Sequence, residues 1–454
     1  MRRPATHPGR YAFWWLALAT LLPLWGYLLL AGPQYEPDLH YYLTGALHWH
    51  PLHPPGTNMF LSVCHRLWPS AYLPVLLQTL AFALCLAALL HYGLRLRGWV
   101  ALLPSLWLGL DPLPAYLLLS LQSEALFMAS LLLLLTALLR RAPAWQLGLL
   151  LGLAFLFRYQ ALFSLPAVAV WVGLRSWRAR SGVGHSLALL LLPLGLVVGI
   201  EQLGHRLQGH HHYPVQGKRL WDNASALAPE QAAPGPLARL LRQQRDSLER
   251  VRPGHWQRYP RARYQLGEWA LHLRRSQLIA RGQSPAQAWQ QADAELAALT
   301  PYPPLQVHGQ LLADNLRALY RHPWLEYRHL PAYRPVQAAE YRELDQLVYR
   351  LYGYRQQLAR QPAAWQRASW QRLALGMYTL VALLLVALGC WRRALRAPTG
   401  FVLLPLALLL LGVPIQPRFV LVYGPVLVAL AAAQYARRCN RRDVAAGYRP
   451  VNLL

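Results

Sequence analysis

The chain has 454 residues, of which 55% are hydrophobic, 14% are charged and 18 are tryptophan. This composition is too apolar for an ordinary soluble enzyme, yet a mean hydropathy of +0.19 is low for a protein that lies wholly in a membrane. The formal charge of +27 does not indicate nucleic-acid binding, because much of it is arginine in short loops and no soluble helix interleaves a basic run with aromatic residues.

Long apolar segments alternate with polar connections along the chain. A full crossing needs about 20 apolar residues, so the shorter segments are expected to be tilted or to be broken helices around a polar cavity. About ten spans are predicted, over residues 11–31, 71–91, 99–110, 124–139, 145–157, 161–174, 186–203, 373–390, 401–413 and 419–435. We therefore predict an all-α polytopic membrane protein.

The spans divide the chain into three parts. Residues 1–203 form an N-terminal membrane module of about seven spans, in which 32–70 is the first outer loop. Residues 204–370 form a polar, mostly helical region that is long enough to be a domain. Residues 371–454 form a C-terminal module of about three spans with a basic tail.

One stretch of the polar region carries an apolar stripe at helical spacing. Its residues are Leu344, Leu347, Val348 and Leu351. Such a stripe predicts a helix that packs on other helices or on the membrane surface. It carries no catalytic signature.

Positive charge marks every second connection between the predicted spans. These connections contain Arg95 and Arg97, Arg140 and Arg141, and Arg175, Arg178 and Arg180. By the positive-inside rule both termini are then cytoplasmic, and residues 32–70 and 204–370 lie outside. A composition rich in arginine and leucine with a single lysine is typical of a GC-rich bacterial gene, which favours a bacterial cytoplasmic membrane.

Carboxylates gather at the outer ends of the predicted spans. Outside residues 204–370 the outward acids are Glu36, Asp38, Asp111, Glu124 and Glu201, and Arg66, Arg158 and Arg418 are also on that side. Ionisable groups close to hydrocarbon are costly and usually mark a substrate or ion pathway. The pattern therefore predicts a functional site at the outer face.

The stretch after the first span concentrates these groups. Pro37 suits the first turn of a helix and Pro51 lies where that helix should have ended. On such a helix Asp38, Tyr41 and Tyr42 share one face, which could line a reaction cavity. A short amphipathic helix lying on the membrane surface would carry the same residues on its wet side, so the sequence leaves both interpretations open.

Five motifs then follow one another over the two membrane modules. They are Asp38-x-x-Tyr41, His53-Pro54-Pro55-Gly56, Gln122-Ser123-Glu124-Ala125-Leu126, Gly148-x-x-x-Gly152-Leu153-Ala154 followed by Arg158 and Pro166, and Pro417-Arg418-Phe419 followed by Pro425. In their order and topology they resemble the GT-C glycosyltransferases, the superfamily of protein O-mannosyltransferases and lipid A aminoarabinose transferases. The chain departs from that pattern in two places, because Leu39 follows Asp38 where many members have a second acid, and His53 precedes the prolines where many have a basic residue.

The resemblance implies a GT-C-like bundle and an enzyme that moves a sugar from a polyprenyl-phosphate donor to a glycan, lipid or protein acceptor, with inversion. An acceptor hydroxyl needs a carboxylate base, and a departing phosphate needs guanidinium groups. The expected catalytic residues are Asp38 as general base and Glu124, which orients the acceptor or the base. The expected phosphate-binding residues are Arg158, Arg418, Arg66 and His53, and those lining the sugar or acceptor site are Glu36, Tyr41, Tyr42 and Asp111.

Two other classes of function fit parts of the sequence. A membrane-embedded glycan ligase or polymerase would depend on outer arginines and histidines and leave Asp38 dispensable. A transporter or flippase for a lipid-linked sugar would also cluster ionisable groups, although it would more often contain an internal repeat. No cofactor and no metal ligands are predicted, and the need for a divalent metal stays open. The expected partners are the lipid donor, the acceptor and membrane lipids.

Overall fold

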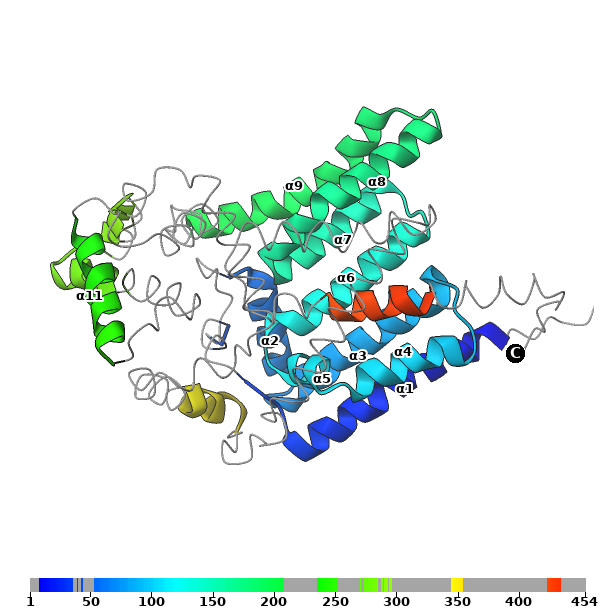
Figure 1. The fold of residues 1–454 in the computed structure, drawn as a ribbon, viewed down its shortest axis with the longest axis horizontal. Coiled ribbons are helices and arrows are strands. Elements are labelled where there is room, and N and C mark those ends of the chain that lie inside the picture. Colours follow the sequence, from blue (N-terminus) through cyan, green and yellow to red (C-terminus); the bar gives the residue numbers. More distant parts are fainter. Residues whose placement is uncertain are drawn as a thin grey trace, which may run out of the picture.

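The computed structural model describes residues 8–35, 39, 42–43, 53–207, 235–251, 270, 273–284, 287–288, 290–292, 294–295, 344–353 and 423–433. These residues are predominantly helical, and the nearest approach to a sheet among them is an isolated bridge between Gln34 and Ser120. The predicted all-α class is therefore confirmed for the part of the chain that the structure describes (Figure 1).

The labelled helices follow in this order: α1 (Pro8–Ala31), α2 (Pro55–Leu67), α3 (Tyr72–Ala88), the π-helical turn η2 (Leu89–Gly93), α4 (Trp99–Leu110), α5 (Pro112–Leu119), α6 (Ser123–Leu139), α7 (Ala144–Phe157), the 3-10 helix η3 (Tyr159–Ser164), α8 (Leu165–Arg178), α9 (Val183–Leu207) and α11 (Pro236–Val251). Further helical segments lie at 273–280, at 344–352 and at Gly424–Ala433. Each of the seven spans predicted in residues 1–203 coincides with one of the long helices, although α8 begins only after η3.

Three of these helices are long and apolar enough to cross a membrane. They are Tyr11–Ala31, Tyr72–Gly93 and Val183–Gly204. Shorter apolar helices are Trp99–Leu110, Ser123–Leu139, Ala144–Phe157 and Gly424–Ala433. The chain is thus a helical protein with candidate membrane spans, and the full count of about ten stays a prediction.

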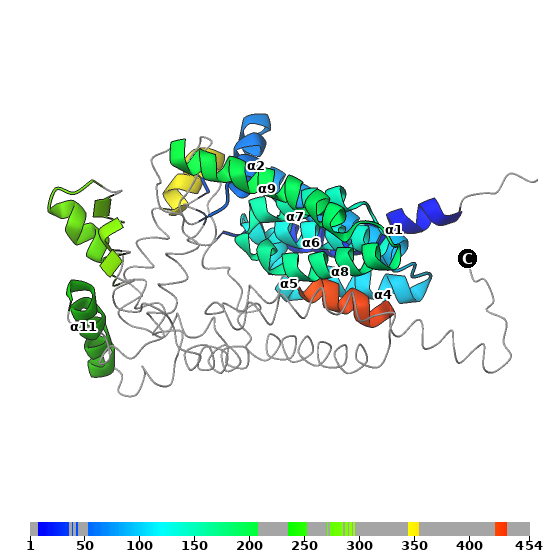
Figure 2. The ribbon, with the colours of Figure 1, turned by 90° about the horizontal axis from the view of Figure 1, so that it is seen from above.

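The long helices form one bundle with a shared core (Figures 1 and 2). α7 packs on α9 and α6, α1 packs on α4, and α3 packs on α6. The helix Gly424–Ala433, drawn in red, contributes Leu427 and Leu430 to this same core, and Tyr423 just before it contributes as well. The last predicted span is therefore joined to the N-terminal module over the residues described.

Small residues bring the helices of the bundle close together. A Cβ on Gly148 of α7 would overlap the carbonyl oxygen of Leu190 in α9, and one on Gly152 would lie 2.9 Å from a methyl carbon of Val197. This is the small-xxx-small packing by which helices approach in membranes. The Gly148-x-x-x-Gly152 motif thus fixes the contact between α7 and α9.

The outer surface of the bundle exposes large apolar side chains. On α9 these are Leu192, Leu196, Ile200 and Leu203, which are 73%, 65%, 56% and 56% exposed. A soluble monomer rarely presents such a continuous apolar stripe to water, whereas lipid would cover it at no cost. The buried face of the same helix contains Glu201.

The two ends of the bundle differ in charge. The start of α1 and the connections that contain Arg95, Arg141 and Arg180 lie at one end, on the right of Figure 1, and α2 and α5 lie at the other. Each of these three arginines has a positive φ, of 56°, 57° and 51° respectively. This left-handed conformation is the usual one after a helix, but glycine normally adopts it.

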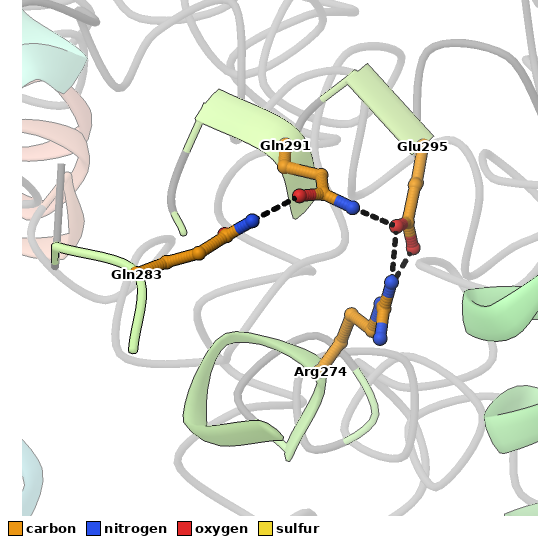
Figure 3. A network of polar contacts seen from close by, with 4 residues as sticks. All are labelled: Arg274, Gln283, Gln291 and Glu295. Atoms are coloured by element: carbon orange, nitrogen blue, oxygen red, sulfur yellow. Dashed lines mark hydrogen bonds and ion pairs between the residues drawn. The ribbon is translucent and has the colours of Figure 1, made fainter. Parts of the chain in front are cut away.

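The polar region has a small core of its own around α11. Leu237 and Leu241 of α11 pack with Leu278, Ala288 and Ala292. Beside them Arg274 donates to both carboxylate oxygens of Glu295, at 2.8 and 2.6 Å (Figure 3).

Two glutamines extend this pair into a network. The Gln291 amide donates to Glu295 at 3.2 Å, and the Gln283 amide donates to Gln291 at 2.7 Å. A planar guanidinium fork on a carboxylate is the strongest kind of ion pair, so this network holds these short helical segments together.

Candidate functional site

The loop after α1 is fixed at its start to the connection between α5 and α6. The amide of Gln34 donates to the carbonyl of Leu119 at 2.9 Å, and the amide of Leu121 donates back to the carbonyl of Gln34 at 2.9 Å. The side-chain amide of Gln78 in α3 donates to the carbonyls of Leu118 and Ser120 at 2.6 and 2.7 Å. These bonds hold the exit of α1 beside the residues that lead into Ser123 and Glu124.

The predicted helix after Pro37 is described only in part. The amides of Tyr42 and Leu43 both donate to the carbonyl of Leu39, at 2.9 and 3.0 Å, which makes a turn. Tyr42 lies in that turn and Leu43 is outside any helix, so a continuous helix from Pro37 to Pro51 is not what the structure has at these positions. The predicted residues Glu36, Asp38 and Tyr41 lie outside the described residues.

Tyr42 and His53, both predicted site residues, contact each other. The Tyr42 hydroxyl is 3.0 Å from Nδ1 of His53, and the two rings meet edge to face. The side-chain amide of Asn58 in α2 donates to the carbonyl of Tyr42 at 2.7 Å. The His53-Pro54-Pro55-Gly56 motif therefore carries α2 back onto the turn at Tyr42.

Helix α2 then packs by its first turn against the end of α7. A Cβ on Gly56 would lie 2.5 Å from the carbonyl oxygen of Leu156, so this approach requires glycine. Helix α7 ends at Phe157, and Arg158 follows in an extended conformation. The proline and glycine motif of the first loop is thus placed next to Arg158.

The partly buried Arg158 and the buried Glu124 form an ion pair. Nη1 of Arg158 contacts Oε1 of Glu124 in the first turn of α6, and the two side chains are 13% and 2% exposed. Nη1 also donates to the Ser123 hydroxyl at 3.2 Å, and that hydroxyl lies 3.4 Å from Oε2 of Glu124. A carboxylate at a helix N-terminus is stabilised by the helix dipole, and here a guanidinium stabilises it as well.

A second polar contact lies one residue further along. The Tyr159 hydroxyl donates to Oε1 of Glu201 at 2.6 Å, and Glu201 is only 1% exposed. The sequence placed Glu201 at the outer end of a span but gave it no partner. Two buried carboxylates of the bundle are therefore tied to consecutive residues, Arg158 and Tyr159.

The other predicted residues have separate positions. Asp111 is buried at the break between α4 and α5, beside Tyr27. Arg66 is exposed in the last turn of α2. It is ten residues after Gly56, which corresponds to about 15 Å along the helix from the contact with α7. Arg418 lies outside the described residues.

The predicted apolar stripe in the polar region packs on the first loop. Leu344, Val348 and Tyr352 share a core cluster with Tyr35, Leu39, Tyr42, Leu43 and Leu61. The Tyr35 hydroxyl donates to the Asp345 carboxylate, and the Tyr352 ring meets His65 of α2 edge to face. Residues 344–352 therefore cover the loop in which the predicted base lies.

Sequence reasoning did not find several residues near Arg158. Gln160, Ser164 and Tyr423 are buried polar side chains there, and only their polarity within apolar runs could have drawn attention to them. Among the described residues, no group of three or more His, Cys, Asp or Glu side chains is arranged to hold a metal ion. No family model, curated protein or solved structure matches the chain.

Proposed function

We propose that this protein is a membrane glycosyltransferase, which transfers a sugar from a polyprenyl-phosphate donor to a glycan, lipid or protein acceptor at the outer face of a bacterial cytoplasmic membrane. The observation that carries the proposal is the buried cluster of Ser123, Glu124 and Arg158. It lies at the end of the bundle opposite the arginine-rich connections, and the first outer loop enters and leaves beside it.

A polar cluster of this kind suits the departing group of the reaction. Polyprenyl phosphate leaves with increasing negative charge on its oxygens, and a guanidinium in a dry site stabilises that charge. The planar guanidinium of an arginine has five N–H donors, so Arg158 can contact a carboxylate and a phosphate together. In this proposal Arg418 is the second phosphate ligand.

The acceptor is activated by Asp38. Its carboxylate takes the proton of the acceptor hydroxyl while the hydroxyl oxygen bonds to the anomeric carbon from the face opposite the phosphate. The bond between that carbon and the phosphate oxygen breaks, so the configuration inverts and polyprenyl phosphate is released. Asp38 follows Gln34 by four positions, and Gln34 is fixed beside the start of α6.

The ion pair changes the role we assign to Glu124. Because its carboxylate is bonded to Arg158 and Ser123, Glu124 positions the phosphate-binding arginine. Glu124 is buried and paired with Arg158, whereas a general base needs a carboxylate oxygen that is free to take the proton of the acceptor hydroxyl.

The test is Asp38→Asn in membranes supplied with labelled polyprenyl-phosphate sugar. Transfer should fall by about 100-fold or more, because general-base assistance contributes about this much. Asp246→Asn is the matched control, since Asp246 is an exposed residue of α11. Near wild-type transfer by Asp38→Asn would refute the assignment of the base. A wild-type protein that never consumes such a donor would refute the proposed function, and movement of the lipid across the membrane without conversion would identify the transporter alternative.

A further inference from the structure

The core next to Arg158 contains polar atoms without hydrogen-bond partners. Both amide atoms of Gln160 make no hydrogen bond with any described residue, and the hydroxyls of Ser164 and Tyr423 have no partner there apart from each other. The three side chains are 9%, 0% and 0% exposed. They lie on η3 and at the start of the helix Gly424–Ala433.

These groups are neighbours of the ion pair. Gln160 and Ser164 follow Arg158 in η3, and the Tyr423 hydroxyl lies beside Ser164 and within electrostatic range of the Arg158 guanidinium. The Tyr423 ring meets Phe127 edge to face with 6.4 Å between ring centres, and Phe127 is one turn after Glu124 in α6. Residues from η3, from α6 and from the C-terminal helix thus converge at one place.

Four buried hydroxyls in the middle of the long helices have partners, whereas the hydroxyls of Thr57 and Ser120 are buried without one. Thr79, Ser105, Ser130 and Thr136 are all buried, and each donates to the backbone carbonyl four residues earlier in its own helix, at 2.8, 3.2, 2.8 and 2.7 Å. Burial of a hydroxyl without a partner costs free energy that such bonds avoid. The groups beside Arg158 therefore differ from the hydroxyls in the middle of the long helices, and three such side chains gather around one ion pair.

We propose that Gln160, Ser164 and Tyr423 form a subsite for the hydroxyl groups of the transferred sugar. This inference rests on the proposed function and deepens it. The amide and the two hydroxyls can each donate and accept, which matches sugar hydroxyls, and none of them carries the charge that an ionic ligand would require. Arg158 next to them would hold the phosphate, and the sugar of such a donor is bonded directly to its phosphate.

Binding to purified protein in lipid nanodiscs tests this subsite. The probes are bare polyprenyl phosphate and polyprenyl phosphate that carries mannose, glucose or arabinose. Ser164→Ala and Tyr423→Phe should each weaken binding of the best sugar-bearing lipid by about three- to tenfold, the worth of one neutral hydrogen bond. The affinity for bare polyprenyl phosphate should not change.

A second measurement separates binding from folding. Without ligand, Ser164→Ala and Tyr423→Phe should change Tm less than Ser130→Ala does, because the hydroxyls they remove have at most each other as partners. Ser130→Ala and Tyr27→Phe are matched controls whose hydroxyls bond to the carbonyls of Leu126 and Leu110, and they should leave both affinities unchanged.

The outcomes separate this inference from the function on which it rests. Equal weakening for bare and sugar-bearing lipid, unchanged affinity for both, or a fall in Tm in the Ser164 and Tyr423 variants as large as that of Ser130→Ala would overturn the subsite alone. If the wild-type protein bound none of the three sugar-bearing lipids, both the subsite and the proposed function would be overturned.

Discussion

Arg158 and Glu124 come from different helices and meet in the interior of the bundle. Two charges removed from water pay a desolvation cost that only close contact and further hydrogen bonds offset. Ser123 supplies such a bond to Arg158. Because Glu124 is only 2% exposed, the contribution of the pair to stability is seen chiefly when Arg158 is removed and the Glu124 carboxylate is left buried alone.

Removal of one member of this pair should destabilise the protein strongly. We expect Arg158→Leu to lower the free energy of unfolding by about 3–5 kcal/mol, and the double variant with Glu124→Leu to lose less than the sum of the two single changes. Denaturant unfolding in detergent measures both. Arg245→Leu, which breaks an exposed pair with Asp246 in α11, is the control and should cost about 1 kcal/mol or less. Equal losses in the two arginine variants would contradict a buried pair.

At the scale of elements, α7 is the helix on which the site depends. The glycines of α7 set the distance between α7 and α9. The end of α7 contacts Gly56 of α2, and Arg158 follows the last residue of α7. A change in the packing of α7 would therefore move the guanidinium relative to the first loop, although no group of the site is itself altered.

A methyl group at Gly148 should disturb this packing. In Gly148→Ala the new Cβ meets the Leu190 carbonyl, which is backbone and cannot turn aside, so we expect a loss of about 1–3 kcal/mol. Gly199→Ala in α9 is the matched control, because nothing lies within 4 Å of a Cβ there and alanine favours a helix more than glycine does. Thermal unfolding of both variants checks this, and equal Tm values would contradict the close contact.

Segment 344–352 should protect Cys64 of α2. Cys64 is buried and close to Tyr352, and burial raises the pKa of its thiol to about 11, so little reactive thiolate exists at pH 8. Val348→Asp should release the segment and increase alkylation of Cys64 by a water-soluble maleimide. The measurement uses a chain in which Cys85, Cys390 and Cys439 are serine, and Leu347→Asp, at a partly exposed position, is the milder comparison. An unchanged rate in Val348→Asp would show that the segment does not cover α2.

The sequence predicted the long helices better than the connections between them. Apolar runs and basic loops were enough to place seven helices in residues 1–203, because hydrophobicity alone decides those elements. Helix α2 was not predicted, since it is amphipathic and short, and its position depends on contacts with α7 and with Tyr42. Arg158 and Glu124 were each predicted as site residues, but their pairing depends on packing between α6 and α7, which no local pattern contains.

The two ends of the described helix bundle differ from each other. One end carries the arginine-rich connections, and the other carries α2, α5 and the buried cluster around Arg158. If a membrane surrounds the apolar middle, the first end is cytoplasmic by the positive-inside rule and the second is outside. Exposed Trp99, Trp145 and Trp177 beside the basic connections suit one membrane interface.

Single cysteines should report this orientation. In a chain without native cysteines, a cysteine at Ser181 in the connection after α8 should react with a membrane-impermeant maleimide only after the cells are opened, and one at Ser70 before α3 should react in intact cells. Both positions are outside the helices, so labelling should not require unfolding. Reaction of both from the same side would contradict an odd number of crossings between them.

The left-handed arginines Arg95, Arg141 and Arg180 have a consequence for how the chain acquires its topology. At these positions glycine would be conformationally cheaper, so the chain accepts a small strain at the end of a helix in return for a charge at the same residue. If the proposed topology holds, the residue at which each helix ends is also the residue that resists translocation. A shift of the helix register during insertion would then move the end of the helix and the charge by the same number of residues.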